Sequence, residues 1–123
     1  MARRADPPGL THLRVTFSDA FYLGPGRADL LEGIATTGSI AAAGKAMGMS
    51  YKRAWSLVRA LNAGFGRPLV TTSRGGSDQG GAALTEEGQF VLERYRSMQQ
   101  ATRKAIAADV AAVAGKLDIS GRK

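Results

Sequence analysis

The segment of residues 38–61, GSIAAAGKAMGMSYKRAWSLVRAL, constrains the fold more than any other part of the chain, because it carries the signals of two short helices joined by a tight turn. Ser39 and Ser50 each stand where a hydroxyl group can cap the helix that follows. Gly48 favours the left-handed backbone conformation that ends a helix. Gly44 stands where the two helices would approach most closely. The pattern predicts a helix-turn-helix whose second helix enters the major groove of DNA.

The second helix would bury one stripe of apolar residues and display a basic face. The stripe recurs at steps of four, three and four residues: Ala54, Val58, Leu61 and Phe65. The opposite face carries cationic and hydroxyl side chains, which can reach base edges and phosphates. The residues that we expect to contact DNA are Ser39, Lys45, Ser50, Tyr51, Lys52, Arg53, Ser56, Arg59 and, from a following hairpin, Arg74.

The distribution of charge separates this interpretation from a simpler one. Amphipathic helix pairs are common, and a basic outer face is often only solvated. Such a face usually mixes both signs of charge, however. Between Glu32 and Asp78 the chain has no acidic residue, although it has six cationic ones: Lys45, Lys52, Arg53, Arg59, Arg67 and Arg74. A region of one sign, centred on the turn, predicts contact with a polyanion.

Length and composition exclude several classes of protein. With 123 residues and a formal net charge of +7, the chain has room for one compact domain and one protruding element. It has no cysteine, which excludes a disulfide framework and a zinc finger. No apolar run is long enough to cross a bilayer, so we expect a cytoplasmic protein with no membrane partner.

Catalysis is not expected. With no cysteine, one histidine and no paired carboxylates near a glycine-rich turn, no catalytic set can be assembled. We therefore expect neither an enzyme nor a cofactor or metal site.

The segments before the helix-turn-helix complete a small domain over residues 13–84. Residues 1–12 are expected to form a mobile lead. Apolar and polar residues alternate over residues 13–17 and an apolar segment returns at residues 21–23, which predicts a β-hairpin. A helix over residues 27–36, after a break at Gly24-Pro25-Gly26, would give a three-helix core.

A second hairpin follows the helix-turn-helix. Residues 69–73 are rich in β-forming residues, residues 74–81 are rich in glycine, and an apolar segment returns at residues 82–84. A hairpin in this position is typical of a wing, from which Arg74 would reach a phosphate or the minor groove. A flexible loop without contact to DNA remains the alternative.

The last element is predicted to be one long helix over residues 85–117, followed by a short tail at residues 118–123. Thr85 stands at the cap position, and Glu86 and Glu87 fall in the first turn, where they favour the helix dipole. One apolar stripe runs along the whole helix, and it is too long for a small core to cover. We expect this stripe to pair with a second copy of the chain, and the alternative is a frayed end. The expected dimerisation residues are Val91, Tyr95, Met98, Thr102, Ile106, Val110 and Val113, with Leu117 at the end of the stripe.

Four segments resemble one known family. They are LGPGRADLLEGIATTGSI at residues 23–40, MSYKRAW at residues 49–55, LNAGFGRPLV at residues 61–70 and ALTEEG at residues 83–88. The chain resembles the N-terminal winged-helix DNA-binding domain of molybdate-responsive, ModE-type transcriptional regulators, which are related to LysR-type regulators. The resemblance covers residues 13–98.

The resemblance implies a mainly α winged helix-turn-helix that binds operator DNA as a homodimer, with Ser50, Tyr51, Lys52, Arg53 and the wing at the DNA. The sequence departs from the family in two respects. Ser77-Asp78-Gln79 interrupts the wing tip, so a wing contact would depend on Arg74. The family's molybdate-binding domains are also missing from these 123 residues, so we expect a regulator that lacks the ligand-sensing domain and acts alone or with a separate sensor protein.

A nonspecific architectural or RNA-associated basic protein is the alternative function. Such a protein would be expected to spread its basic residues evenly and to expose several aromatic rings for stacking on bases. Tyr51 is the only aromatic residue on the basic face, and Trp55 is expected at the boundary of the core. The sequence therefore favours a sequence-specific regulator, and the resemblance implies target genes of molybdate or oxyanion metabolism.

Overall fold

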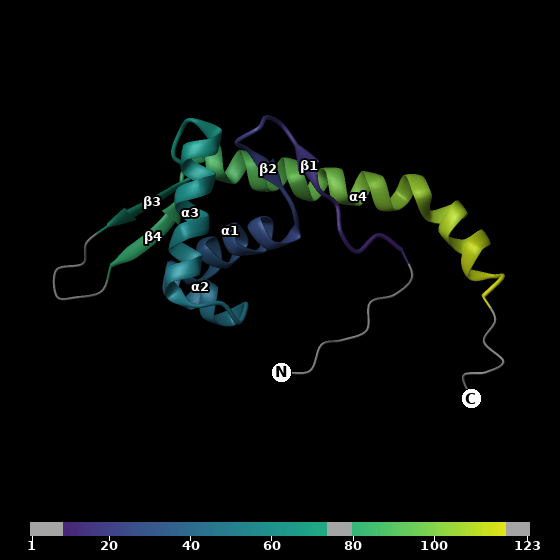
Figure 1. Ribbon diagram of the computed structural model, residues 1–123, viewed down its shortest axis with the longest axis horizontal. Coiled ribbons are helices and arrows are strands. Elements are labelled where there is room, and N and C mark those ends of the chain that lie inside the picture. The colour runs from purple at the N-terminus through teal and green to yellow at the C-terminus, as the bar shows by residue number, and fades with distance from the viewer. Residues whose placement is uncertain (1–8, 74–79, 118–123) are drawn as a thin grey trace.

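The computed structural model describes residues 9–73 and 80–117, and it has the predicted fold class, a mainly helical winged helix-turn-helix (Figure 1). Two small antiparallel hairpins flank three helices, and a long fourth helix follows. In chain order the elements are β1 (Val15–Thr16), β2 (Tyr22–Leu23), α1 (Pro25–Thr37), α2 (Ile40–Ala46), α3 (Tyr51–Phe65), β3 (Val70–Ser73), β4 (Gly81–Leu84) and α4 (Glu86–Ala114). No helix in the described ranges is both long and apolar enough to cross a membrane.

Helix α1 begins earlier than the sequence analysis expected. Gly24-Pro25-Gly26 was expected to break the chain before the helix, but Pro25 lies in the first turn of α1. The fixed φ of proline suits this position, and its missing N–H has no partner to lose there. The helix ends at Gly38, whose φ of 75° is left-handed. The last helical residue, Thr37, lies one position beyond the predicted range of 27–36.

The two hairpins have the expected positions. In the first, Val15 pairs with Leu23 and Thr16 with Tyr22. In the second, the wing, the register runs from Val70 opposite Leu84 to Ser73 opposite Gly81. The two hairpins form separate sheets on different sides of the helical core (Figure 1).

The core forms around α1, which contacts α2, β4 and α4. Leu30, Leu31 and Ile34 are fully buried on this helix. The N-terminal hairpin of β1 and β2 contributes Phe21 to this core. The ring centroid of Phe21 lies 5.3 Å from that of Phe65 at the end of α3. The predicted inward stripe of α3 is confirmed for Ala54, Val58 and Leu61, which are buried, whereas Phe65 is half-buried against the core.

The first half of α4 belongs to this core. The Thr85 hydroxyl accepts a hydrogen bond from the backbone N–H of Gly88 at 2.9 Å, which confirms the predicted cap. A Cβ atom on Gly88 would collide with the carbonyl oxygen of Leu69, so the start of α4 packs directly on the backbone before β3. Arg96 binds Asp29 and Glu32 of α1 at 2.8 and 2.6 Å. Burial alone would lower the pKa of Arg96, but its hydrogen bonds to these two carboxylates outweigh it and raise the pKa.

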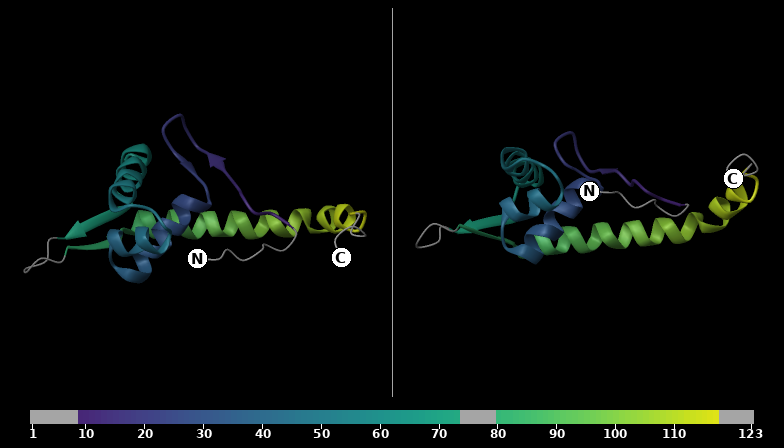
Figure 2. Two further views of the ribbon diagram at one scale, coloured as in Figure 1. Left: turned by 60° about the horizontal axis from the view of Figure 1, so that its bottom comes forward. Right: turned by 90° about the horizontal axis from the view of Figure 1, so that it is seen from below.

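The structure corrects two of the expected dimerisation residues. Val91 and Tyr95 are buried in the core of a single chain, and the Tyr95 hydroxyl donates a hydrogen bond to the carbonyl oxygen of Leu13 at 2.6 Å. They do not face outward because the first turns of α4 lie across α1 and beside the N-terminal hairpin (Figure 2). The buried residues of α4 end at Gln99, and the helix continues well beyond the compact part of the molecule.

Candidate nucleic-acid interface

The angle between α2 and α3 is fixed by a close contact at Gly44. A Cβ atom on Gly44 would lie 2.8 Å from the Cβ of Ala54 and 3.4 Å from the side chain of Met49. Any larger residue would therefore push the two helices apart. Gly48 has a φ of 76°, and the N–H of Met49 donates to the carbonyl of Gly44 at 3.0 Å. The tight turn predicted for this segment is confirmed.

Ser39 and Ser50 are the helix caps that the sequence predicted. The Ser39 hydroxyl accepts a hydrogen bond from the N–H of Ala42 at 3.0 Å, and the Ser50 hydroxyl accepts one from the N–H of Arg53 at 3.1 Å. Both side chains therefore stabilise helix ends. Each hydroxyl still has its own O–H, which is free to donate to an acceptor outside the helix.

The outward face of α3 is accessible along its length. The side chains expected to contact DNA from this helix are all exposed: Tyr51, Lys52, Arg53, Ser56 and Arg59. Lys45 is exposed in the last turn of α2. Ser50 is exposed as well, whereas Ser39 is half-buried. Arg74 lies outside the described residues.

Two aromatic side chains stand together at the start of α3. The rings of Tyr51 and Trp55 meet edge to face with centroids 6.3 Å apart, and Tyr51 is 59% exposed. The guanidinium of Arg59 lies 5.5 Å from the Trp55 ring. This arrangement gives the N-terminal half of α3 a partly apolar surface beside its cationic side chains.

One basic residue of the one-sign region has a partner that the sequence did not reveal. Arg67 forms a salt bridge with Glu87 at 2.7 Å. Glu87 lies 20 residues further along the chain, in the first turn of α4. The surface with only positive charge is therefore formed by α2 and α3, and it ends at the base of the wing, where Arg67 pairs with Glu87.

The wing is attached to the helix-turn-helix by hydrogen bonds. The N–H of Ala82 in β4 donates to the carbonyl of Gly38 at 2.9 Å. The side-chain oxygen of Asn62 in α3 accepts from the N–H groups of Leu69 and Val70 at 2.8 and 3.2 Å, and its amide donates to the Val70 carbonyl at 3.1 Å. The root of the wing is therefore fixed to both the corner before α2 and the end of α3.

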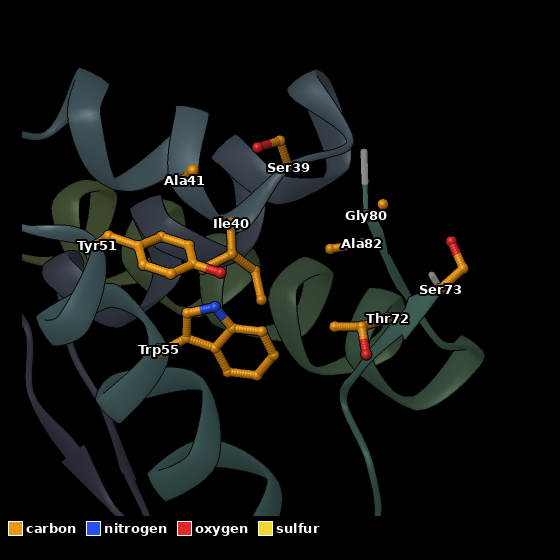
Figure 3. A pocket seen from close by; sticks show the side chains of 10 residues that line it. Ser39, Ile40, Ala41, Tyr51, Trp55, Thr72, Ser73, Gly80 and Ala82 are labelled. Atoms are coloured by element: carbon orange, nitrogen blue, oxygen red, sulfur yellow. The ribbon is translucent and has the colours of Figure 1, made fainter. Parts of the chain in front are cut away.

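A hollow of about 520 Å³ lies between the start of α2, the start of α3 and the wing strands (Figure 3). Its lining comes from segments that are up to 43 positions apart in the sequence, so no local pattern predicts it. Its lining consists of small, hydroxyl-bearing and aromatic residues: Ser39, Ile40, Ala41, Tyr51, Trp55, Thr72, Ser73, Gly80, Gly81 and Ala82. In the described ranges, no group of three or more His, Cys, Asp or Glu side chains could hold a metal ion.

Comparison with known proteins gives consistent matches. The chain is 38% identical to the molybdenum-pterin-binding protein MopA of Rhodobacter capsulatus over 101 residues, covering 82% of this chain and 38% of MopA. It is 36% identical to the DNA-binding transcriptional dual regulator ModE of Escherichia coli K12 over 93 residues, covering 76% of this chain and 36% of ModE. The chain therefore spans little more than a third of the length of these two relatives.

Structural and family comparisons agree with the fold. The crystal structure of VV2_1132, a LysR family transcriptional regulator, superposes with a TM-score of 0.51 at 22% identity, over 67% of this chain and 28% of that one. At this identity the likeness concerns the fold alone. Residues 27–89, more than half of the chain, match the family described as bacterial regulatory helix-turn-helix protein, lysR family. The chain belongs to this lysR family, and its helix-turn-helix domain is of the ModE type.

Proposed function

We propose that this chain binds operator DNA as a homodimer and regulates the transcription of genes for molybdenum uptake or use. The observation that carries the proposal is the outward face of α3, where Tyr51, Lys52, Arg53 and Arg59 are exposed with no acidic residue between Glu32 and Asp78. Side chains of this kind at the start of a recognition helix reach base edges and phosphates in the major groove.

The molybdenum assignment comes from the relatives. MopA is described as molybdenum-pterin-binding and ModE as a DNA-binding transcriptional dual regulator. The matched part of this chain contains the helix-turn-helix and the wing, which are the parts that would select an operator. We therefore infer that the operators lie at genes of molybdenum metabolism, in the cytoplasm where bacterial DNA is found.

Two exposed apolar surfaces support the homodimer. Beyond Gln99, the stripe on α4 continues through Ile106 and Val110 to Val113, which is 71% exposed. An apolar groove of about 390 Å³ lies beside the first half of α4, where Phe17 and Phe90 are 53% and 54% exposed. An antiparallel pair of α4 helices would bring the distal stripe of one copy toward the groove of the other. It would also hold two copies of α3 for a two-fold operator.

The test is a comparison of α3 variants on a selected operator. Genomic fragments that the protein retains are identified, and affinities are then measured for the parent, Lys52→Ala and Arg53→Ala. We expect each variant to weaken operator binding by about 1 to 3 kcal/mol. Lys104→Ala on the solvent side of α4 is the matched control, and it should bind like the parent. If Lys52→Ala and Arg53→Ala also bind like the parent, α3 is not the recognition helix.

The same measurements address the alternative function. For the regulator, log K should fall with log salt with a slope of about −4 to −8, and affinity for the operator should exceed that for random duplex. Equal affinity for every duplex, or tighter binding to single-stranded RNA, would instead indicate an architectural or RNA-associated protein.

A further inference from the structure

The hollow lined by Tyr51, Trp55 and the wing strands separates α3 from the wing (Figure 3). If α3 enters the major groove and the wing approaches the adjacent minor groove, the sugar-phosphate strand that separates these grooves runs between them. The hollow occupies that position, with Tyr51 and Trp55 on one side and Thr72, Ser73 and Gly80 on the other (Figure 3). We infer that it seats one sugar-phosphate strand through uncharged contacts, with a deoxyribose against Trp55. This inference rests on the proposed function.

The chemistry of the lining fits this strand. Ile40, Trp55 and Ala82 supply an apolar surface, and the carbon face of a deoxyribose is apolar as well. Hydroxyl groups surround that surface, and hydroxyls are common donors to phosphate oxygens. They belong to Ser39, Tyr51, Thr72 and Ser73. None of the ten lining residues in the part of the chain that the structure describes is charged, so their contact differs in kind from those of Lys52 and Arg53.

The two walls of the hollow are fixed relative to each other. The hydrogen bond from Ala82 to Gly38 ties β4 to the corner that precedes α2. On the wing side the backbone is closely packed: a Cβ atom on Gly80 would lie 3.2 Å from the Ser73 carbonyl oxygen, and one on Gly81 would lie 3.1 Å from the Ser73 hydroxyl. The hollow therefore exists before DNA arrives, and a strand can enter without reordering its walls.

Uncharged contacts to the backbone have two measurable consequences. They displace few counterions, so they contribute affinity that does not depend on salt. They also touch no base edge, so they contribute equally to operator and to unrelated duplex. Loss of a cationic contact to phosphate, in contrast, makes the slope of log K against log salt less steep by about one.

The experiment fills the hollow and compares neighbouring positions. Ala82→Leu places a larger side chain in the hollow, and Ala83→Leu places the same side chain at the exposed next position of β4, outside the lining. We expect Ala82→Leu to weaken binding at least about tenfold, both to the operator and to a mixed-sequence duplex of about 30 base pairs, with an unchanged salt slope. Ala83→Leu should bind like the parent. Circular dichroism and thermal unfolding verify that both variants are folded.

A second variant avoids any change of packing. Tyr51→Phe removes one hydroxyl from an exposed ring, and it should weaken binding about three- to tenfold without changing the salt slope. Trp55 is the only tryptophan of the chain, so its fluorescence reports on the hollow directly. Saturating mixed-sequence duplex should protect Trp55 from acrylamide quenching in the parent and in Ala83→Leu.

The outcomes are distinguishable. If Ala82→Leu and Tyr51→Phe bind like the parent while Lys52→Ala binds more weakly, DNA binding stands and the hollow is not used. An altered salt slope in Tyr51→Phe, or Trp55 that is equally quenched in the saturated complex, also overturns the inference. If the parent chain binds no duplex, the proposed function itself fails.

Discussion

The two halves of α4 belong to one continuous helix but have different surroundings. All five of its buried residues lie between Gly88 and Gln99, and salt bridges from Arg96 to α1 hold that half in place. In the second half, the side chains of the apolar stripe remain partly or largely exposed, up to Val113. The helix is about 44 Å long, so it extends past the core that supports it. One regular apolar stripe is thus buried along the first half of the helix and exposed along the second.

The largest loss of stability is expected in the first half of α4, which packs on the core. Tyr95→Ala removes a fully buried ring and leaves the Leu13 carbonyl without its donor, so we expect the free energy of unfolding to fall by about 3 to 5 kcal/mol. Urea denaturation measures the loss. Val113→Ala is the distal control, and it should change the value by no more than about 0.5 kcal/mol in dilute protein. Similar losses at both positions would show that the two halves do not differ.

Removal of the second half of α4, which extends past the core, should weaken DNA binding more than it lowers the stability of the fold. A chain that ends at Gln100 keeps every buried residue of α4, whereas a cut after Arg94 would remove Tyr95 from the core. We expect the shortened protein to unfold cooperatively as a monomer, with affinity for a two-fold operator reduced about 100-fold or more. Light scattering and operator titration provide the measurements. A shortened chain that is still dimeric would locate the interface elsewhere, for example at the apolar groove.

Single substitutions refine the comparison by identifying the face that pairs. Ile106→Asp places a charge on the expected stripe, and we expect the dissociation constant of the dimer to rise at least about tenfold. Ala108→Asp introduces the same side chain about 200° around the helix, and it should leave the dimer intact. Sedimentation velocity compares the two. If Ala108→Asp separates the dimer and Ile106→Asp does not, the alanine-bearing face is the interface.

A small effect of pH on stability is expected from Tyr95, in the first half of α4. Burial raises the pKa of Tyr95 above its ordinary value of 10.0, so the unfolded chain loses this proton at a lower pH than the folded one. The contribution of Tyr95 to the free energy of unfolding is therefore complete below about pH 10, and it is lost as pH rises through the pKa of Tyr95 in the folded chain. Alkaline unfolding curves of the parent should decline in this range more steeply than those of Tyr95→Phe. Equal curves would show that Tyr95 ionises as readily in the folded chain as in the unfolded one.

The parts of this structure that the sequence predicts are those determined by neighbouring residues. The caps at Ser39, Ser50 and Thr85 each involve an N–H three residues away, and Gly38 and Gly48 end helices through their own backbone conformation. Signals of this range can be read without knowledge of the tertiary structure. Periodicity likewise predicted the buried face of α3 and the existence of α4.

Features that depend on contacts between distant segments were missed. Periodicity shows that Tyr95 and Ile106 share a face, but only the packing of α4 on α1 shows that Tyr95 already has its partners in the same chain. Trp55 lines the hollow only because the fold brings the wing strands beside α3, a contact between segments far apart in the sequence. Which side chains touch DNA stays a prediction, because the structure shows their exposure and not their contacts.

Asn62 has a consequence for the evolution of this protein. Its one side chain both accepts hydrogen bonds from the backbone of β3 and donates one to it, in place of a neighbouring strand. Aspartate would lose the donor, and glutamine would set the amide one methylene too far out. We therefore expect almost no substitution to be tolerated at Asn62, whereas the exposed neighbour Ala63 should tolerate many. A residue that touches no DNA in this proposal is then expected to vary as little as those that read the operator.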